Sequence, residues 1–286
     1  MIAKLLGRAK HPVGDRGIKV MEERIGEWRT RAAEDFLRTV YTLQQTRIPV
    51  SVIDLSRVLR ITPSAITDMI RRLGPRQLDT DLPHTICALP APLVDHKPYH
   101  GVWLTAEGEL IALQVIRRRR LLELFLVETL GYTWDEVDQE ADRLEHDLSE
   151  KLTDRLAAHL SNPTVDPHGD PIPTANGVLL AASEDTTLIQ MVVGEQGQIT
   201  RIVDYSPELL HYLGDLGLRP NVEIVVTNRS PIGDTIMVQV SGSDKICTLS
   251  AQLAKHIYLT RLRDELKSPR NNLEPYHSVT EVQEPE

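Results

Sequence analysis

The segment VSVIDLSRVLRITPSAITDMIRRL, residues 50–73, decides the first part of the fold. Its first ten residues, 50–59, predict a short helix, and a turn follows. Thr62 is a good N-cap and Pro63 suits the first helical position, so a second helix is expected to the end of the segment. Helix, short turn and capped helix is the helix-turn-helix pattern, whose second helix enters the major groove of DNA. A three-helix core with no role in DNA binding is the alternative.

Polar side chains gather on the outer face of the second of these helices. Those near its start are placed to read base edges, whereas the arginines at its end suit phosphates. The residues expected to contact DNA are Thr62, Ser64, Thr67, Asp68, Arg71 and Arg72.

The flanking segments complete a winged helix. From Glu22 to Gln45 the apolar residues recur at intervals of three and four, which predicts an amphipathic helix. On the other side, Gln77–His100 is rich in Pro and apolar residues, and 101–104 reads as a returning strand. We therefore expect a β-hairpin wing with a long tip interrupted by prolines.

A longer helical region begins at Thr105 and contains the block Arg117–Arg120. Four consecutive arginines cover all sides of a helix, so some should face the preceding module and others water. The apolar residues between Leu121 and Leu130 exceed what one amphipathic helix needs. They predict a buried subunit interface of a symmetric dimer, and a core within one chain is the alternative.

The next helix is predicted from Trp134 to His159 and contains an acidic stretch, DQEADRLEH, at residues 138–146. Residues three and four apart share a helix face, so Asp142, Glu145 and His146 converge there and Asp138 extends the patch by a turn. Two carboxylates and an imidazole are suitable ligands for a divalent metal. A solvated acidic face is the alternative, and the stretch alone does not decide between them.

In the last part of the chain, the sequence pattern changes to the period expected for β-strands. A Pro-containing segment, 162–173, ends the helical region, and a short helix is expected at Pro207–Leu216. The predicted strands lie at 187–191, 197–203, 223–226, 235–240 and 256–259. Their length and spacing fit a small β-barrel of about seventy residues.

The whole-chain charge of −9 conceals two opposite regions. Residues 1–77 carry fifteen Lys and Arg against eight Asp and Glu, a balance of +7, whereas residues 131–160 carry three against nine, a balance of −6. Such segregation indicates a basic module that faces phosphates and an acidic module that holds cations.

Membrane and secretory signals are missing from the sequence. It has no run of about 18 apolar residues, and its first twenty residues lack the apolar centre of a secretory signal. We therefore expect a cytoplasmic location and no membrane partner. Cys87 and Cys247 fit no metal-binding spacing, so thiols are expected rather than a disulfide framework.

Four motifs carry a family resemblance: AEDFLRTVY at 33–41, RLLELFL at 120–126, EADRLEH at 140–146 and DPHGDPIP at 166–173. From about residue 22 to 262 the chain resembles the metal-dependent repressors of the diphtheria toxin repressor and manganese transport regulator family. The resemblance implies a mainly α fold with a β C-terminal domain. Its parts would be a winged helix-turn-helix, a helical dimerisation and metal-binding domain, and a small FeoA-like SH3 barrel.

The domain boundaries follow from this layout. They are 1–21 for a flexible arm, 22–108 for the DNA-binding domain, 109–174 for the helical domain, 175–186 for a linker, 187–264 for the barrel and 265–286 for a disordered tail.

The resemblance implies a primary metal site made of Asp35, Asp142, Glu145 and His146. Where the iron-sensing branch of the family has sulfur residues, this chain has Asp35 and Asp142, as in the manganese-sensing branch. Oxygen ligands suit Mn²⁺ better than soft ligands would. Mn²⁺ is therefore the preferred ion, with Fe²⁺ compatible.

Two arginines depart from the family pattern. Arg119 stands where the family commonly has a His that serves a second ion, and Arg38 stands where the manganese branch has a carboxylate. Either cation disfavours a second metal by repulsion. The accessory site is therefore expected to be lost or rebuilt from Glu123 and Asp138, with a barrel residue such as Glu208 or His211. Arg119 could also stand in for a cation.

The function that the resemblance implies is a regulator, not an enzyme, that senses Mn²⁺ or Fe²⁺ and represses metal-uptake genes. It would bind double-stranded operator DNA as a homodimer and take no small organic substrate. Without metal, repulsion between Asp35 and the cluster of Asp142 and Glu145 would loosen the first helix. The alternatives are a metal-independent winged-helix regulator and a metalloenzyme, although the sequence shows no separate nucleophile or base motif.

Overall fold

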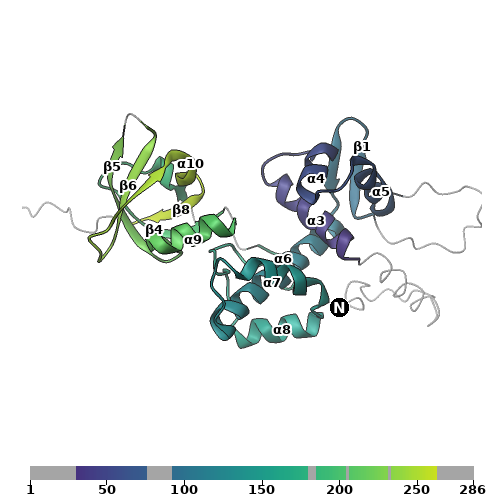
Figure 1. Cartoon of the computed structure of the whole chain (residues 1–286). Coiled ribbons are helices and arrows are strands. Elements are labelled where there is room, and N and C mark those ends of the chain that lie inside the picture. The colour runs from purple at the N-terminus through teal and green to yellow at the C-terminus, as the bar shows by residue number, and fades with distance from the viewer. Residues whose placement is uncertain (1–29, 76–91, 180–184, 204–205, 231–232, 263–286) are drawn as a thin grey trace, which may run out of the picture.

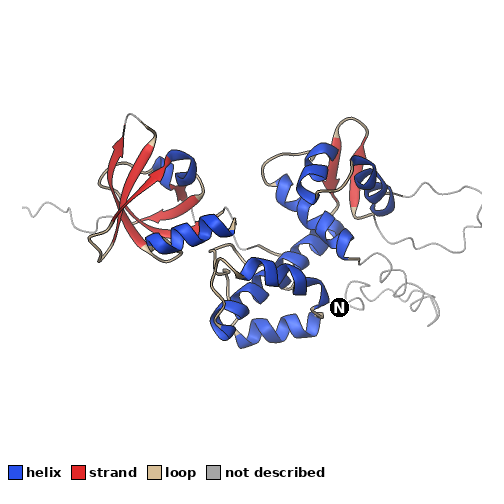
Figure 2. Ribbon diagram, in the orientation of Figure 1, coloured by secondary structure: helices blue, strands red, loops and turns tan. Residues whose placement is uncertain are grey.

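Three structural units follow one another along the chain (Figure 1). The computed structural model describes residues 30–75, 92–179, 185–203, 206–230 and 233–262. A winged-helix unit and a β unit lie on opposite sides of a central helical unit, and Figure 2 shows that most strands belong to the β unit. The predicted arm, 1–21, and tail, 265–286, lie outside the described residues.

The winged-helix unit forms around capped helices. Its elements are α3 (Arg31–Gln44), α4 (Val52–Leu59), α5 (Pro63–Leu73), β1 (Val94–Lys97) and β2 (Gly101–Leu104). Thr30, Ser51 and Thr62 each accept a hydrogen bond from the backbone N–H three residues later, which satisfies one free donor of each helix. Phe36 and Ile66 are fully buried between the helices. The predicted helix-turn-helix is present.

Boundaries in this unit differ from the predicted ones. The first helix begins at Arg31 rather than Glu22, because Thr30 is extended and caps it, and residues 22–29 lie outside the described part. Val50 precedes α4 and pairs with Val102 as an isolated bridge. The predicted long wing tip is wrong. A short turn, 98–100, joins β1 to β2, and residues 76–91 precede the hairpin outside the described residues.

The helical unit consists of α6 (Ala106–Leu130), α7 (Val137–Leu144), the 3-10 turn η1 (Glu145–Asp147) and α8 (Glu150–His159). The prediction of one helix from Trp134 to His159 is wrong. Leu148 is extended, and the Ser149 side chain accepts from the Leu152 N–H to cap a new helix. Serine is a preferred N-cap residue because its side-chain oxygen accepts a hydrogen bond from a free backbone N–H of the first turn. Among the described residues, no helix combines the length and apolar character needed to cross a membrane.

The leucines of α6 are buried within one chain. Leu121 and Leu124 pack in a cluster with Ala157 and Ile172, and Leu122 and Leu126 belong to a second cluster with Val137 and Ala141. Because α7, α8 and the segment after α8 cover these four leucines, they form a core within one chain, and the predicted subunit interface stays a prediction. Leu130, at the end of α6, is exposed.

The β unit is a six-stranded antiparallel sheet in the order β3-β8-β4-β5-β6-β7. Its elements are β3 (Thr186–Thr187), η2 (Leu188–Gln190), β4 (Gln196–Ile202), α9 (Pro207–Leu216), β5 (Glu223–Ser230), β6 (Thr235–Val240), β7 (Ile246–Ser250), α10 (Ala251–Ala254) and β8 (Ile257–Arg261). The helix at 207–216 was predicted correctly. The predicted strand at 187–191 is mostly the 3-10 turn η2, and β7 was missed.

The β unit docks on the helical unit through Trp134 and the segment 162–173. Trp134, in the loop between α6 and α7, is buried in the core of the β unit. The His168 carbonyl accepts a hydrogen bond from the Ile202 N–H, 3.0 Å away, in β4. Gly169 has a φ of +89°, and a Cβ there would lie 1.9 Å from the Thr200 carbonyl oxygen. Backbone therefore packs directly on backbone at this joint.

We expect Gly169→Ala to destabilise the protein by about 1–3 kcal/mol, since the new Cβ would have to displace β4 and positive φ is costly for alanine. Urea denaturation followed by circular dichroism measures this loss. Gly217→Ala is a suitable control because Gly217 has a similar φ of +78°, and a Cβ added there would meet no atom within 4 Å. Equal losses in the two variants would show that backbone strain, rather than the joint, decides the effect.

Candidate metal centre and DNA-binding face

One cluster of potential metal ligands joins α3 to η1. Asp35 comes from α3, whereas Glu145 and His146 are adjacent residues of η1. His146 Nε2 lies 3.3 Å from Asp35 Oδ1 and 3.4 Å from Glu145 Oε1. Glu145 is completely buried. Residues separated by more than a hundred positions therefore present one nitrogen and two oxygens to a common point, and we call them the first cluster.

The orientation of His146 is set by residues that were not predicted to belong to the site. His146 Nδ1 lies 2.7 Å from Glu34 Oε2, and this carboxylate forms a buried ion pair of 2.8 Å with Arg118 Nη2. Arg118 Nε also donates to the Glu145 carbonyl, at 3.1 Å. A carboxylate that accepts the Nδ1–H leaves Nε2 as the basic atom, as in many metal-ligating histidines. Glu34 is adjacent to Asp35 in the sequence, but the sequence does not show that Glu34 contacts His146 and Arg118.

The spacing of the first cluster suits a small divalent cation. When metal–ligand bonds of about 2.1 Å meet at right angles, neighbouring ligand atoms lie about 3 Å apart. The separations of 3.3 and 3.4 Å around His146 Nε2 are close to that value. These three residues therefore have the chemistry and the geometry of a half-formed metal site.

The fourth predicted ligand, Asp142, lies at the rim. Its Oδ1 is 3.3 Å from Arg38 Nη2 and 2.9 Å from Arg119 Nη1. These two guanidinium groups lower the pKa of Asp142 against the opposing effect of burial. Arg38, on α3, also contacts Asp35 Oδ1 at 3.0 Å and Glu145 Oε1 at 2.9 Å. The prediction of unscreened repulsion between Asp35 and the carboxylates of Asp142 and Glu145 is therefore wrong, because the Arg38 guanidinium contacts all three.

Arg119 is surrounded by carboxylates of the helical unit. Its Nε donates to Glu123 Oε1 at 2.9 Å, Nη2 donates to Asp138, and Nη1 lies 3.5 Å from Glu145 Oε2. Burial lowers the pKa of Arg119, but these acidic neighbours outweigh it and raise the pKa above its ordinary value. The predicted accessory ligands Glu123 and Asp138 thus meet at a cation that the chain itself supplies.

The other arginines of the block also have protein partners. Arg117 donates to the Pro173 carbonyl, and Arg120 donates to the Pro171 carbonyl and pairs with Asp166 and Asp170. Arg118 is buried and pairs with Glu34 of α3, whereas Arg117, Arg119 and Arg120 stay partly exposed, so the expectation that some arginines face the preceding module and others face water holds in part. The contacts of Arg117 and Arg120 hold the segment 162–173 against α6.

A second cluster combines Glu123 with Asp166 and His168, and all three are buried. His168 Nδ1 lies 3.9 Å from Glu123 Oε2 and 4.0 Å from Asp166 Oδ1, while Nε2 lies 2.9 Å from the Trp134 carbonyl oxygen. Because that carbonyl can only accept, Nε2 carries the proton and Nδ1 faces the carboxylates. Asp166 and His168 belong to the motif at 166–173, but only the fold brings them close to Glu123.

Burial weakens the acidity of the second cluster. It raises the pKa of Glu123 to about 8, with Asp166 adding to the effect, although Arg119 and Arg120 oppose it. Burial, together with Asp170, raises the pKa of Asp166 to about 6. Asp166 Oδ1 also accepts the backbone N–H groups of His168 and Asp170. A cation in the second cluster would therefore compete with a proton and with existing hydrogen bonds.

The predicted barrel contributions to the accessory site are not part of either cluster. His211 Nδ1 lies 3.0 Å from Asp135 Oδ2, and its Nε2 lies 3.7 Å from Asp215. Glu208 is exposed on the first turn of α9. The β unit instead reaches the second cluster through its backbone contact with His168.

The helix α5 presents a polar outer face. Thr62, Ser64, Thr67, Asp68, Arg71 and Arg72 are all exposed, while Ile66, Met69, Ile70 and Leu73 are buried. Asp68 and Arg71 form a 2.6 Å ion pair one helical turn apart. A helix with one polar exposed face and one apolar buried face can place the polar face in a major groove while the apolar face packs on the core.

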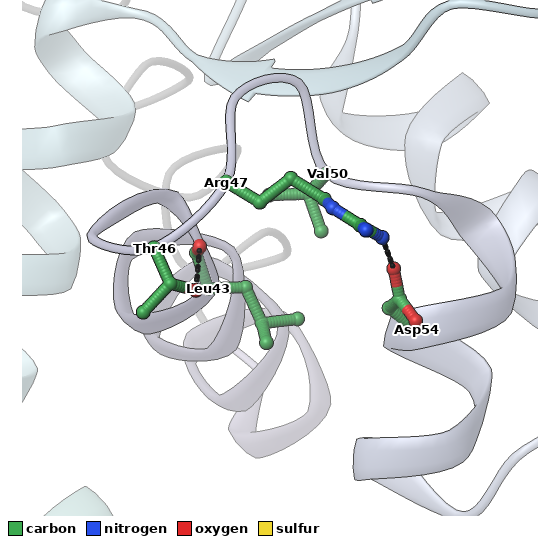
Figure 3. Close-up of a pocket in the computed structure, with 5 residues that line it drawn as sticks. All are labelled: Leu43, Thr46, Arg47, Val50 and Asp54. Carbon is green, nitrogen blue, oxygen red and sulfur yellow. Dashed lines mark hydrogen bonds and ion pairs between the residues drawn. The ribbon is translucent and has the colours of Figure 1, made fainter. Parts of the chain in front are cut away.

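A pocket of about 340 Å³ lies where α3 approaches α4 (Figure 3). It is lined by Leu43, Thr46, Arg47, Val50 and Asp54. Arg47 Nη1 points toward Asp54 Oδ2 at 3.2 Å, as Figure 3 shows. The pocket contains one carboxylate, already paired with Arg47 and Arg57, so it lacks the donor set of the two clusters.

Three family models match the chain. The N-terminal DNA-binding domain of iron-dependent repressors matches residues 29–77, and their metal-binding and dimerisation domain matches residues 105–174. The FeoA domain matches residues 186–261. Together the matches include α3, α5, α6, η1 and the β unit, and therefore both ligand clusters.

Relatives and solved structures agree with these matches. The chain is 34% identical to the iron-dependent repressor IdeR of Mycobacterium leprae over 173 residues, which cover 56% of this chain and 73% of that protein. It is 24% identical to the diphtheria toxin repressor of Corynebacterium jeikeium over 218 residues, covering 68% of this chain and 85% of that protein. A solved manganese-dependent transcriptional repressor in complex with manganese is 33% identical, with a TM-score of 0.68, and the match covers 80% of this chain and 100% of that one. The chain therefore belongs to the iron-dependent repressor family of iron- and manganese-dependent transcriptional repressors.

Proposed function

We propose that this protein represses transcription in response to a divalent cation held by Asp35, Asp142, Glu145 and His146. The observation that supports the proposal most strongly is the meeting of Asp35, from the winged-helix unit, with Glu145 and His146, from the helical unit. An ion bound by ligands from both units adds a link between them. Binding would therefore favour one relative placement of the two units.

We further propose Mn²⁺ as the preferred ion, with Fe²⁺ as the runner-up. The proposed ligands are three carboxylates and one imidazole, with no sulfur. Hard oxygen donors suit Mn²⁺, whereas sulfur would favour softer ions. The likeness to a solved repressor described as a manganese complex supports the same choice. Glu123, Asp166 and His168 are the residues that would hold a second ion, in place of the predicted pair of Glu123 and Asp138.

The proposed partner is double-stranded operator DNA, bound by a homodimer. The exposed face of α5 supplies Thr62, Ser64, Thr67 and Asp68 toward bases and Arg71 and Arg72 toward phosphates. The proposed dimer surface includes exposed apolar residues of the helical unit, namely Leu130, Leu144 and Leu152. The domain boundaries given above stay predictions.

The proposal is tested by titrating a fluorescent DNA duplex, selected from random sequences by the metal-loaded protein, and following anisotropy. We expect saturating Mn²⁺ to tighten binding about 5- to 150-fold relative to EDTA, the usual range of allosteric coupling. Fe²⁺ under anaerobic conditions should act more weakly. Equal affinity with and without either ion would instead support a metal-independent regulator. Zn²⁺ serves as a comparison because it binds nitrogen and oxygen ligands tightly.

A further inference from the structure

Arg119 bridges the two ligand clusters. It contacts Glu145 of the first cluster and Glu123 of the second, and it also pairs with Asp138 and Asp142. The Arg119 side chain is only 17% exposed, so water screens these contacts weakly. Even without Glu123, whose pKa burial raises, the three carboxylates of Asp138, Asp142 and Glu145 exceed the single charge of Arg119, and this surplus of negative charge also attracts Arg38.

Each oxygen of Glu145 has its own cationic partner. Oε1 lies 2.9 Å from Arg38 Nη1, and Oε2 lies 3.5 Å from Arg119 Nη1. Asp142 Oδ1 lies between the same two guanidinium groups. Because Arg38 belongs to α3 while Glu145 and Asp142 belong to η1 and α7, this network links the winged-helix unit to the helical unit by protein charges alone.

We propose that Arg119 is a resident cation, which supplies at the junction of the two clusters the positive charge that a further metal ion would otherwise supply. This inference rests on the proposed metal response. Arg119 holds Glu145 and Asp142 in place for Arg38, so part of the operator affinity persists without bound metal. It also excludes one ion, because a cation placed among the same carboxylates would meet the guanidinium at close range.

The test compares the full-length protein with Arg119→Gln and Arg119→Lys. For Arg119→Gln we expect one additional Mn²⁺ per chain, measured by equilibrium dialysis with elemental analysis. Its operator affinity in EDTA should fall about tenfold below that of the unaltered protein, since the carboxylates lose their cation. Saturating Mn²⁺ should return it to within about twofold. Arg119→Lys keeps the positive charge, so the number of bound Mn²⁺ ions should stay unchanged. The single ammonium group of lysine cannot make all the contacts of the Arg119 guanidinium with its carboxylate partners.

Arg143→Gln is the matched control, because Arg143 is an exposed arginine of α7 that pairs with Glu140 one turn away. It should change neither the Mn²⁺ count nor the affinity in EDTA. The inference is overturned if Arg119→Gln binds the same number of ions as the unaltered protein, or if its loss of affinity persists in saturating Mn²⁺. If the unaltered protein shows no Mn²⁺-dependent operator binding, the proposed function fails, and the ion count still decides the role of Arg119.

Discussion

Replacing His146 by alanine should abolish the metal response of operator binding. Its Nε2 faces Asp35 and Glu145, and the neighbouring Glu34 fixes which nitrogen is basic. Without the imidazole, only the carboxylates of Asp35, Asp142 and Glu145 remain, and Arg38 competes for their oxygens. We expect the affinity measured by anisotropy in saturating Mn²⁺ to drop to the value in EDTA, a loss of about 5- to 150-fold.

The matched control for this variant is His211→Ala. His211 also lies beside a carboxylate, Asp135, at 3.0 Å, but it is exposed on α9 and belongs to neither cluster. Its response to Mn²⁺ should be unchanged. A His146→Ala protein that still responds fully to Mn²⁺ would show that the sensed ion binds elsewhere, and the second cluster would then be the site to alter, through His168→Ala.

Replacing Arg118 by methionine should cost about 3–5 kcal/mol of stability, because it leaves the Glu34 carboxylate buried without its guanidinium partner. Both side chains of this 2.8 Å pair are less than a tenth exposed. Arg118 Nε also donates to the Glu145 carbonyl, so η1 should loosen as well. Urea denaturation followed by circular dichroism measures the loss.

A double variant separates the charge from the packing. Glu34→Gln with Arg118→Met removes both charges, and it should recover most of the stability lost in Arg118→Met alone. Arg143→Met, at an exposed ion pair, should change stability by no more than about 1 kcal/mol. If Arg118→Met costs as little as this control, the buried pair does not hold α3 to α6.

Local signals were sufficient for much of the helical and strand pattern. Thr62 and Pro63 place the start of α5, and Pro207 places the start of α9, because capping oxygens and fixed proline φ act within one turn. The same local reasoning failed at residues 145–149. There one helix was predicted from Trp134 to His159, whereas Ser149 caps a new helix and Glu145 and His146 lie in a 3-10 turn.

Through the family resemblance, the sequence predicted the ligands Asp35, Asp142, Glu145 and His146, and it showed the departures at Arg38 and Arg119, because residue identities need no coordinates. Tertiary structure alone decided their partners: Glu34 with His146 and Arg118, Asp166 and His168 with Glu123, and Arg119 among four carboxylates. The reason is physical. Charges interact through space over a few ångströms, and only the packing of α3, α6, η1 and the segment 162–173 brings residues that far apart in sequence within that range.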